Sequence, residues 1–259
     1  MSALKIVLFV LFTLSLFADE GKVLFEKHCA SCHVPFIPML KLKENFLDYN
    51  NTLLKLKAPT LNQLSYRLKQ RIGDPKGDID MHRMEVTAFM SDYVIFPDKD
   101  KSVCLADVLQ HFQTMPSLKG EVTEDELEEI GSYLYDFDNE VVKKKSVKYE
   151  GFGKALQRAK KEDKIIMIKA MTKTCHFCRK MDREVMIEKE VVAAIEKDFI
   201  PVAIDISEHQ LPLGIHAALT PSFIFVDKHA RILLNVPGAW GKKDFLELLQ
   251  EAKKSTQKD

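Results

Sequence analysis

The chain has 259 residues, of which 46% are hydrophobic and 29% are charged. This composition is typical of globular protein and excludes disordered chains and integral membrane proteins with several spans. The length is sufficient for two domains, each with its own core. Residues 19–140 contain 14 lysines and arginines against 22 aspartates and glutamates, whereas residues 141–259 contain 23 against 16, so the two halves have opposite net charge.

The N-terminus has the layout of a secretory signal peptide. Lys5 precedes an apolar run at 6–17, which is short for a membrane span of about 20 residues. We therefore predict a signal peptide at 1–18, with cleavage after Ala18. Leu16 stands where such cleavage sites prefer a small residue, so an uncleaved membrane anchor remains an alternative, and it is the one membrane contact that we expect.

The next motif is Cys29-Ala30-Ser31-Cys32-His33. C-x-x-C-H is the attachment signature of a c-type haem, in which both thiols become thioethers and the histidine ligates iron. An ordinary disulfide or half of a zinc site is the alternative, and the sequence supplies few partners for either. The motif therefore predicts one covalently attached haem c, held by Cys29, Cys32 and His33.

Residues 19–138 resemble class I cytochrome c. Gly21 and Phe25 precede the haem motif, and Met115 lies in a Met-Pro context ahead of a helical pattern at 123–135. The resemblance implies an all-α domain, Met115 as the sixth iron ligand, a last helix that crosses the first, and export to the periplasm. A Met/His ligand pair leaves no open position on iron and suits electron transfer.

Several residues of this half have less certain roles. His28, His82 and His111 have no ligand spacing, so we predict ordinary histidines. Cys104 is predicted to be a buried, inert thiol, although exchange with a downstream cysteine pair remains an alternative. Other methionines could ligate the iron in place of Met115, but we expect each of them to pack in the core instead. They are Met39, Met81, Met84 and Met90.

The segment between His33 and Met115 is long for a minimal cytochrome. We expect residues 58–61 to form a loop on the proximal side of the haem and residues 61–72 to form an amphipathic helix. The remainder, through residue 100, is predicted to be an insertion of mixed helix and loop.

Residues 139–150 change the sign of the charge and lack a sustained apolar period. We place a linker there, between a domain at 19–138 and a domain at 151–259. The lysines at 143–145 are interpreted as a solvated basic run, because no interleaved aromatic residues indicate nucleic-acid binding.

The second half alternates between helical and strand patterns, which predicts an α/β layer architecture. The expected elements are a helix at 153–161, a strand at 165–168, a helix at 188–197, strands at 200–206, 223–226 and 232–234, and a helix at 242–254.

A second C-x-x-C, Cys175-His176-Phe177-Cys178, follows the first strand and precedes a helical stretch. This context favours a redox-active dithiol. A haem is not expected, because Arg179 replaces the axial histidine, and zinc would need His209 and His216 as further ligands. A cysteine at a helix N-terminus has a lowered thiol pKa, so Cys175 is the predicted nucleophile and Cys178 the resolving thiol.

Residues 153–254 resemble the thioredoxin fold, particularly the bacterial exported thioredoxin-like domains. The strand, C-x-x-C and helix unit and the sequence Thr220-Pro221-Ser222 carry this resemblance. It implies that Pro221 is a cis proline facing the disulfide and belongs to the catalytic site with Cys175 and Cys178. Thr174 departs from the tryptophan usual in cytoplasmic thioredoxins.

The sequence thus predicts an all-α class I cytochrome c domain followed by an α/β thioredoxin-fold domain. We expect an exported redox protein that combines haem electron transfer with thiol-disulfide exchange. Its expected partners are periplasmic thiol or disulfide proteins and electron-transfer proteins. The alternative is an assembly or sensor protein for cytochrome maturation, in which the haem is structural and the second domain binds or protects partner thiols.

Overall fold

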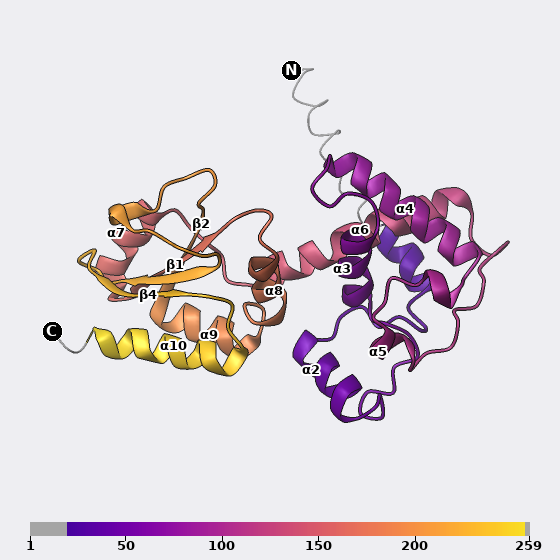
Figure 1. Cartoon of the computed structure of the whole chain (residues 1–259), viewed down its shortest axis with the longest axis horizontal. Helices are drawn as coiled ribbons and strands as arrows, with labels where there is room; N and C mark the ends of the chain where they lie inside the picture. The colour runs from indigo at the N-terminus through magenta and orange to yellow at the C-terminus, as the bar shows by residue number, and fades with distance from the viewer. Residues whose placement is uncertain (1–19, 257–259) are drawn as a thin grey trace, which may run out of the picture. The chain divides into compact units, whose positions relative to one another are not determined.

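The computed structural model describes residues 20–256, so the predicted signal peptide at 1–18 lies outside the described residues. The chain divides into two compact units between Val141 and Val142 (Figure 1). Within residues 20–256, no helix combines the length and the apolar character that a membrane span requires.

The N-terminal unit is helical, as predicted. Residues 20–28 form its first described helix. The elements that follow are α2 (Met39–Lys43), the π-helical η1 (Glu44–Asp48), α3 (Leu61–Arg71), α4 (Ile79–Ile95), the 3-10 helix η2 (Lys99–Lys101), α5 (Ala106–Leu109) and α6 (Glu124–Lys145). The helical class is thereby confirmed, whereas the assignment to class I cytochrome c stays a prediction.

The first helix and α6 cross at very short distance. A Cβ on Gly21 would lie 2.4 Å from the carbonyl oxygen of Glu129 and 2.8 Å from Cβ of Tyr133, so only glycine fits. One turn later, the rings of Phe25 and Tyr133 have centroids 5.8 Å apart. The predicted crossing of the last helix over the first is therefore confirmed.

Side-chain caps explain where α4 and α6 begin. Thr123 and Glu126 form a capping box at the start of α6, since the backbone N–H of Thr123 donates to Glu126 Oε2 (3.0 Å) and that of Glu126 donates to Thr123 Oγ1 (3.2 Å). Asp78 caps α4 by accepting from two backbone N–H groups of its first turn.

The insertion through residue 100 consists of helix and loop, as expected, and most of it is one long helix, α4. Its apolar residues do not follow one face, because Ile79 and Met84 are exposed while Val86 and Met90 are buried. Without a 3.6-residue period, the pattern of apolar residues is a weak indication of a 17-residue helix.

The division between the two units falls inside the predicted linker at 139–150, but the first residues of that segment are helical, because α6 continues to Lys145. The charges at the two ends of α6 help to explain why the helix extends this far. Acidic residues occupy the first turn of α6 and Lys143–Lys145 occupy its last turn, so both ends complement the helix dipole. The lysine run that suggested a solvated linker is thus the end of a helix.

The C-terminal unit has the predicted α/β architecture. Its sheet has the order β2-β1-β3-β4, in which β1 and β2 are parallel and the other pairs are antiparallel (Figure 1). The strands are β1 (Ile165–Met171), β2 (Phe199–Asp205), β3 (Ser222–Val226) and β4 (Ile232–Pro237). The helical elements are α7 (Phe152–Glu162), α8 (His176–Glu184), α9 (Lys189–Asp198), the 3-10 helix η3 (Pro212–Gly214) and α10 (Lys242–Ser255).

Successive side chains of β1 point alternately into two different cores. Ile166, Ile168 and Ala170 pack with Ala155 and Ala159 of α7. The opposite face carries Ile165 and Met167, which belong to the core formed with α8, α9 and α10. Both faces of β1 are therefore covered, which accounts for its nearly continuous apolar sequence.

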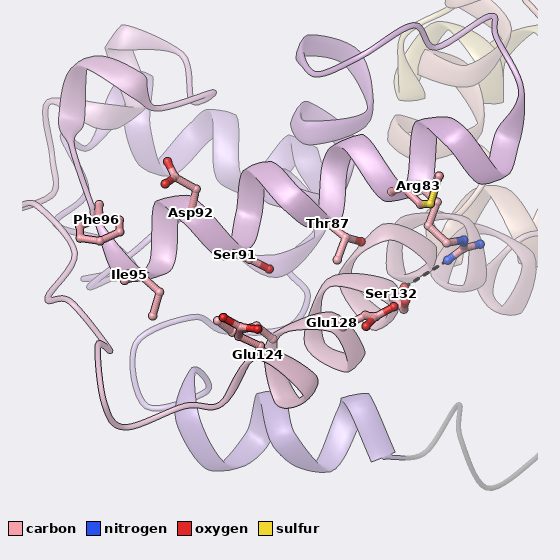
Figure 2. Close-up of a pocket in the computed structure, with 11 residues that line it drawn as sticks. Arg83, Thr87, Ser91, Asp92, Ile95, Phe96, Glu124, Glu128 and Ser132 are labelled. Carbon is pink, nitrogen blue, oxygen red and sulfur yellow. Dashed lines mark hydrogen bonds between the residues drawn. The ribbon is translucent and has the colours of Figure 1, made fainter.

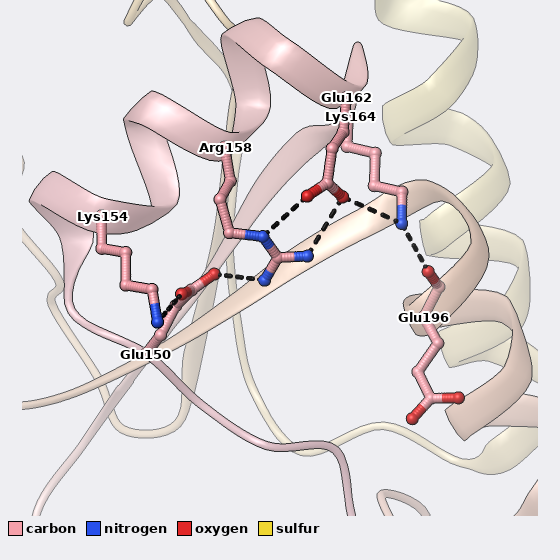
Figure 3. Close-up of polar contacts among 6 residues, drawn as sticks. All are labelled: Glu150, Lys154, Arg158, Glu162, Lys164 and Glu196. Carbon is pink, nitrogen blue, oxygen red and sulfur yellow. Dashed lines mark hydrogen bonds and ion pairs between the residues drawn. The ribbon is translucent and has the colours of Figure 1, made fainter.

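A network of ion pairs joins α7 to its neighbours (Figure 3). Arg158 bridges Glu150 Oε1 at 2.6 Å and Glu162 Oε1 at 2.8 Å, and Lys164 Nζ donates to the carbonyl oxygen of Glu196 at 2.9 Å. The hydrogen bond from Arg158 lowers the pKa of Glu162. The side chains of these pairs are partly exposed, so each pair contributes little to stability.

Candidate functional site

The disulfide of the C-terminal unit lies where β1 passes into α8. Cys175 and Cys178 are bonded to each other, and Cys175 is the N-cap of α8. The backbone N–H of Cys178 donates to Cys175 Sγ at 3.0 Å. Cys175 is half-buried, whereas Cys178 is 1% exposed. Their unequal exposure and the helix N-terminus beside Cys175 are the arrangement that the sequence predicted.

The loop before Cys175 is fastened to the end of β2. The backbone N–H of Lys173 donates to Asp205 Oδ2 at 3.0 Å, and its ammonium group pairs with Glu208. Arg179 reaches back from α8 to the carbonyl oxygen of Lys173 at 3.1 Å. Because Glu208 compensates the charge of Lys173, this lysine is a weak candidate for stabilising a thiolate at Cys175.

Pro221 follows a cis peptide bond, as the resemblance implied. It directly precedes β3, and Ser222 of β3 pairs with Ala170 near the end of β1. The carbonyl oxygen of Pro221 accepts a hydrogen bond from Gly238 N at 2.8 Å. Pro221 therefore lies at the same edge of the sheet from which the C-x-x-C loop leaves β1.

Sequence reasoning missed three polar groups near α8. Lys169 of β1 is 1% exposed and pairs with Asp182 of α8. The hydroxyl of Tyr149 is buried, with no hydrogen-bond partner among the described residues. Lys169 interrupts the apolar sequence of β1, and this interruption is the signal that could have revealed the cluster.

The first C-x-x-C follows the end of the helix over residues 20–28. The thiols of Cys29 and Cys32 are free, the first half-buried and the second exposed. Burial, together with the neighbouring Cys32, raises the pKa of Cys29 to about 11. Cys29 is thus a protonated thiol near neutral pH, which differs from a nucleophilic cysteine.

His33 is held by the loop that we expected beside it. Its Nδ1 lies 2.8 Å from the carbonyl oxygen of Pro59. A carbonyl can only accept, so Nδ1 carries the hydrogen, and in the neutral ring Nε2 is then an unprotonated donor for a metal. Burial lowers the pKa of His33 and so favours this neutral form. Cys29, Cys32 and His33 therefore fit the proximal attachment of a haem.

Met115 lies in the irregular segment between α5 and α6 and is half-buried. Its neighbours contact the end of α4, since Ser117 Oγ donates to the carbonyl oxygen of Ile95 and Leu118 N donates to that of Val94. No hydrogen bond between described residues joins the segment 114–118 to His33. The role of Met115 as the sixth ligand stays a prediction.

The other methionines, histidines and free cysteine of the N-terminal unit differ in burial and in their contacts. Met81 and Met84 are exposed, so the expectation that they fill the core was wrong, whereas Met90 is buried. His82 is an ordinary core histidine, because Nδ1 lies 2.9 Å from Tyr135 OH and Nε2 lies 3.0 Å from the carbonyl oxygen of Ile72. Cys104 is half-buried rather than buried, and burial raises the pKa of its thiol.

A pocket of about 570 Å³ lies between α4 and α6 (Figure 2). Arg83 closes one end through its ion pair with Asp136, at 2.7 Å. Acidic side chains that line the pocket are Asp92, Glu124 and Glu128. None of the predicted haem ligands or catalytic cysteines lines it. Nor do the described residues contain a cluster of three or more His, Cys, Asp or Glu side chains suited to a metal ion.

Comparison with known proteins gives a match in the C-terminal unit. The sequence model of a family described as "Thioredoxin-like domain" matches residues 152–253. An uncharacterized protein of Aquifex aeolicus (strain VF5) is 25% identical over 118 residues, which are 45% of this chain and 72% of that protein. The family match includes every strand of the sheet and the helix α8 that carries the C-x-x-C.

Two solved structures are also similar. A thioredoxin from Thermus thermophilus is 20% identical, with a TM-score of 0.36, and the similarity covers 42% of this chain and 88% of that chain. A disulphide isomerase from Xylella fastidiosa Temecula1 is 17% identical, with a TM-score of 0.27, and the similarity covers 40% of this chain and 86% of that chain.

Proposed function

We propose, from the premise that residues 152–253 form a thioredoxin-like domain, that this part of the chain catalyses thiol-disulfide exchange at Cys175 and Cys178. The observation that carries the proposal is the placement of the pair, with Cys175 at the N-terminus of α8 and Cys178 buried one turn into the same helix. Free N–H groups and the helix dipole favour a thiolate at the first position.

In the reduced protein, the Cys175 thiolate attacks one sulfur of a partner's disulfide. A mixed disulfide forms, and the other sulfur of the partner leaves as a thiolate, which takes up a proton. Cys178 then loses its proton and attacks Cys175 Sγ, so that the intramolecular disulfide forms and the partner's second sulfur leaves. Two electrons pass to the partner. Pro221, at the same edge of the sheet, would border the bound segment of the partner.

We propose that the N-terminal unit is a class I c-type cytochrome, in which Cys29, Cys32, His33 and Met115 would hold one haem c. When bound, the haem would supply one-electron transfer. The support comes from His33, whose Nδ1 is engaged by Pro59, from the two free thiols, and from the close helix crossing at Gly21. The two thiols would form the covalent links, and the Pro59 carbonyl would fix the orientation of the imidazole ring.

We propose export to the periplasm, on the basis of the predicted signal peptide and of the haem motif. The corresponding partners are periplasmic thiol or disulfide proteins and electron-transfer proteins. A membrane contact is proposed only for a chain that keeps its N-terminal apolar segment. We propose no nucleic-acid partner, because no interleaved aromatic residues accompany the lysine run at 143–145.

The experiment that tests this function measures reduction of a protein disulfide by the full-length chain. The chain is first reduced, and it is recycled with excess small dithiol. We expect catalytic turnover that depends on Cys175. If the chain shows no turnover with any common dithiol or protein disulfide, the oxidoreductase proposal fails. That result would favour an assembly or sensor protein for cytochrome maturation.

A further inference from the structure

A loop of the N-terminal unit, residues 44–57, exposes large apolar side chains. Leu47 is 70% exposed, Tyr49 is 47% exposed and Leu53 is 41% exposed. They belong to the end of η1 and to the turn that follows it. A single exposed leucine needs no explanation, whereas three large apolar side chains within one short loop indicate a surface that another molecule covers.

The conformation of the 44–57 loop is fixed from inside by two asparagines. Asn45, which is fully buried, donates from Nδ2 to Asn51 Oδ1 at 2.9 Å, and Asn51 Nδ2 donates to the carbonyl oxygen of Leu56 at 2.9 Å. The backbone N–H of Leu54 donates to Asn45 Oδ1 at 2.8 Å. The loop therefore holds its exposed apolar side chains in place, which lowers the entropic cost of binding through them.

The 44–57 loop is also basic, although its unit is acidic. Residues 39–57 contain four lysines against two acidic residues, whereas residues 19–140 contain 14 basic residues against 22 acidic ones. Lys41 is paired with Glu44 at 2.9 Å. Lys55 and Lys57 are exposed, and neither has an ion pair with another residue in the part of the chain that the structure describes. A surface that fits this loop must combine apolar side chains with carboxylates.

The pocket between α4 and α6 is a surface of that kind (Figure 2). Ile95 and Leu127 are among its apolar lining residues. Asp92 of α4 and Glu124 and Glu128 of α6 supply carboxylates along the same groove (Figure 2). The pocket thus has the apolar and acidic character that the 44–57 loop requires.

Nearby cations leave most of the negative charge of this pocket uncompensated. Arg83 is held by Asp136 at 2.7 Å, outside the group of lining carboxylates. Lys101 lies 3.8 Å from Asp92, but both side chains are more than half exposed, so this pair is weak. Thr87 Oγ1, in the lining, is buried and has no hydrogen-bond partner within residues 20–256. The pocket can therefore accept cationic groups.

The 44–57 loop and the pocket lie at opposite ends of the N-terminal unit. The loop follows α2, whereas the pocket is formed on α4, and Figure 1 shows α2 and α4 at the two ends of that unit. One copy therefore cannot place its own loop in its own pocket. A symmetric contact between two loops is also disfavoured, because it would bring their lysines together.

We propose that the chain associates with further copies of itself head to tail, with the 44–57 loop of one copy in the α4–α6 pocket of the next. Leu47, Tyr49 and Leu53 enter against the apolar lining, and Lys55 and Lys57 face the carboxylates. Such a contact joins two different surfaces, so it need not close into a dimer. The inference is independent of the proposed haem and of the proposed exchange reaction.

The test is sedimentation equilibrium of the full-length chain at about 20 mM and about 500 mM salt. One loop makes a small contact, so we expect a dissociation constant on the order of 100 µM at the lower salt concentration. The average mass should rise with protein concentration beyond that of a dimer, because the contact does not close. At the higher salt concentration the chain should be monomeric. A monomer at every protein concentration in low salt would overturn the proposal.

Exchanging the charges identifies the two surfaces. The loop variant carries Lys55→Glu and Lys57→Glu, and the pocket variant carries Asp92→Lys and Glu128→Lys. We expect each variant alone to associate at least about tenfold more weakly than wild type, because like charges then face one another. An equimolar mixture of the two should regain association, as should a chain with all four substitutions. Failure of both to regain it would contradict the proposed contact.

A matched control changes the net charge elsewhere in the same unit. Lys22→Glu with Lys76→Glu alters the net charge as much as the loop variant does, at exposed positions outside both surfaces. This control should associate within about threefold of wild type. Leu47→Ser keeps the charge and should weaken association about tenfold through lost apolar burial. Equal effects of the control and the loop variant would overturn the proposal.

Cross-linking tests the contact without any substitution. Wild-type chains labelled with ¹⁴N and with ¹⁵N are mixed and treated with a carbodiimide, which joins amines to carboxylates in direct contact. We expect peptide pairs of mixed label that join Lys55 or Lys57 to the pocket carboxylates Asp92, Glu124 or Glu128. Circular dichroism checks that each charge variant is folded, and the cross-links decide if one is not. Mixed-label links that lie only elsewhere would overturn the proposal.

Discussion

The two C-x-x-C motifs have the same spacing but lie at opposite ends of their helices. Cys29 and Cys32 follow the C-terminal end of the helix over residues 20–28, whereas Cys175 caps the N-terminal end of α8. A helix is effectively negative at its C-terminus and positive at its N-terminus. The same pair of cysteines is therefore disfavoured as thiolate in the first unit and favoured in the second.

The residue after each motif strengthens the difference. His33 is fixed by the carbonyl of Pro59, which leaves its Nε2 for a metal, while Arg179 donates to the carbonyl of Lys173 and fastens the loop of the second motif. The spacing of the two cysteines alone therefore does not determine the chemistry. The chemistry also depends on which end of a helix the motif occupies and on the hydrogen bond made by the residue after the second cysteine.

The largest expected effect is on the reduction of a protein disulfide, which should depend on the second motif and not on the first. Cys175→Ser should lower catalysed reduction of a protein disulfide by about a hundredfold or more, because the nucleophile is lost. The double variant Cys29→Ser with Cys32→Ser should keep the activity within about threefold of wild type. Initial rates with a small dithiol as reductant measure both. A loss of activity in the second variant alone would contradict the division of roles.

Thiol reactivity should differ by at least about tenfold. In the reduced chain without haem, a pKa of about 11 leaves Cys29 with about one thiolate in ten thousand molecules at pH 7. Cys175 benefits from the helix N-terminus and should be alkylated far faster. Peptide-resolved iodoacetamide labelling measures the two rates in one sample. Equal rates would show that helix polarity does not distinguish the two sites.

The stability of the first unit should be sensitive to the side-chain volume at Gly21, where two helices cross. Gly21→Val places a side chain against Glu129 and Tyr133, so we expect roughly 2–3 kcal/mol of destabilisation from overpacking. The matched control is Gly153→Ala in α7, where a Cβ meets nothing within 4 Å and helix propensity favours alanine by less than about 1 kcal/mol. Urea unfolding measures both. An unchanged Gly21→Val variant would argue against the close crossing.

The smallest expected effect is on the pH dependence of stability, through Glu126. Hydrogen bonding to the Thr123 backbone, then to Lys27, lowers the pKa of Glu126 to about 2. A lowered folded-state pKa adds stability above about pH 4.3, the unfolded value, and this stability is lost as the pH falls toward 2. Glu126→Gln should therefore be less stable than wild type at pH 7 and equal to it near pH 2. Urea unfolding at both pH values measures this. A deficit that stays constant with pH would contradict the linkage.

Much of the C-terminal unit could be predicted because its strands are short apolar runs and its helices have a clear period. The expected boundaries of β1 and α10 differ from the observed ones by a few residues at most. The cis Pro221 depended on family resemblance, since nothing in the local sequence requires it. Lys169 is visible as a charged residue in an apolar strand, but its partner Asp182 could not be assigned, because it comes from another element and the contact exists only in the folded chain.

The N-terminal unit was less predictable for physical reasons. The apolar residues of α4 lie on several faces, so the helix shows no useful period. The last turns of α6 are rich in lysine, which suggests solvent and hides the favourable interaction with the helix dipole. By contrast, the loop beside His33 was found from a short local pattern.

The most direct test of the division between the two motifs is a peptide mass measurement on the full-length protein. The chain is produced in a host that attaches c-type haem, then alkylated without reduction and digested. The account predicts that the peptide with Cys29, Cys32 and His33 carries the mass of one haem, while Cys175 and Cys178 remain joined and unalkylated. A haem-free first peptide, with both of its thiols alkylated, would contradict it.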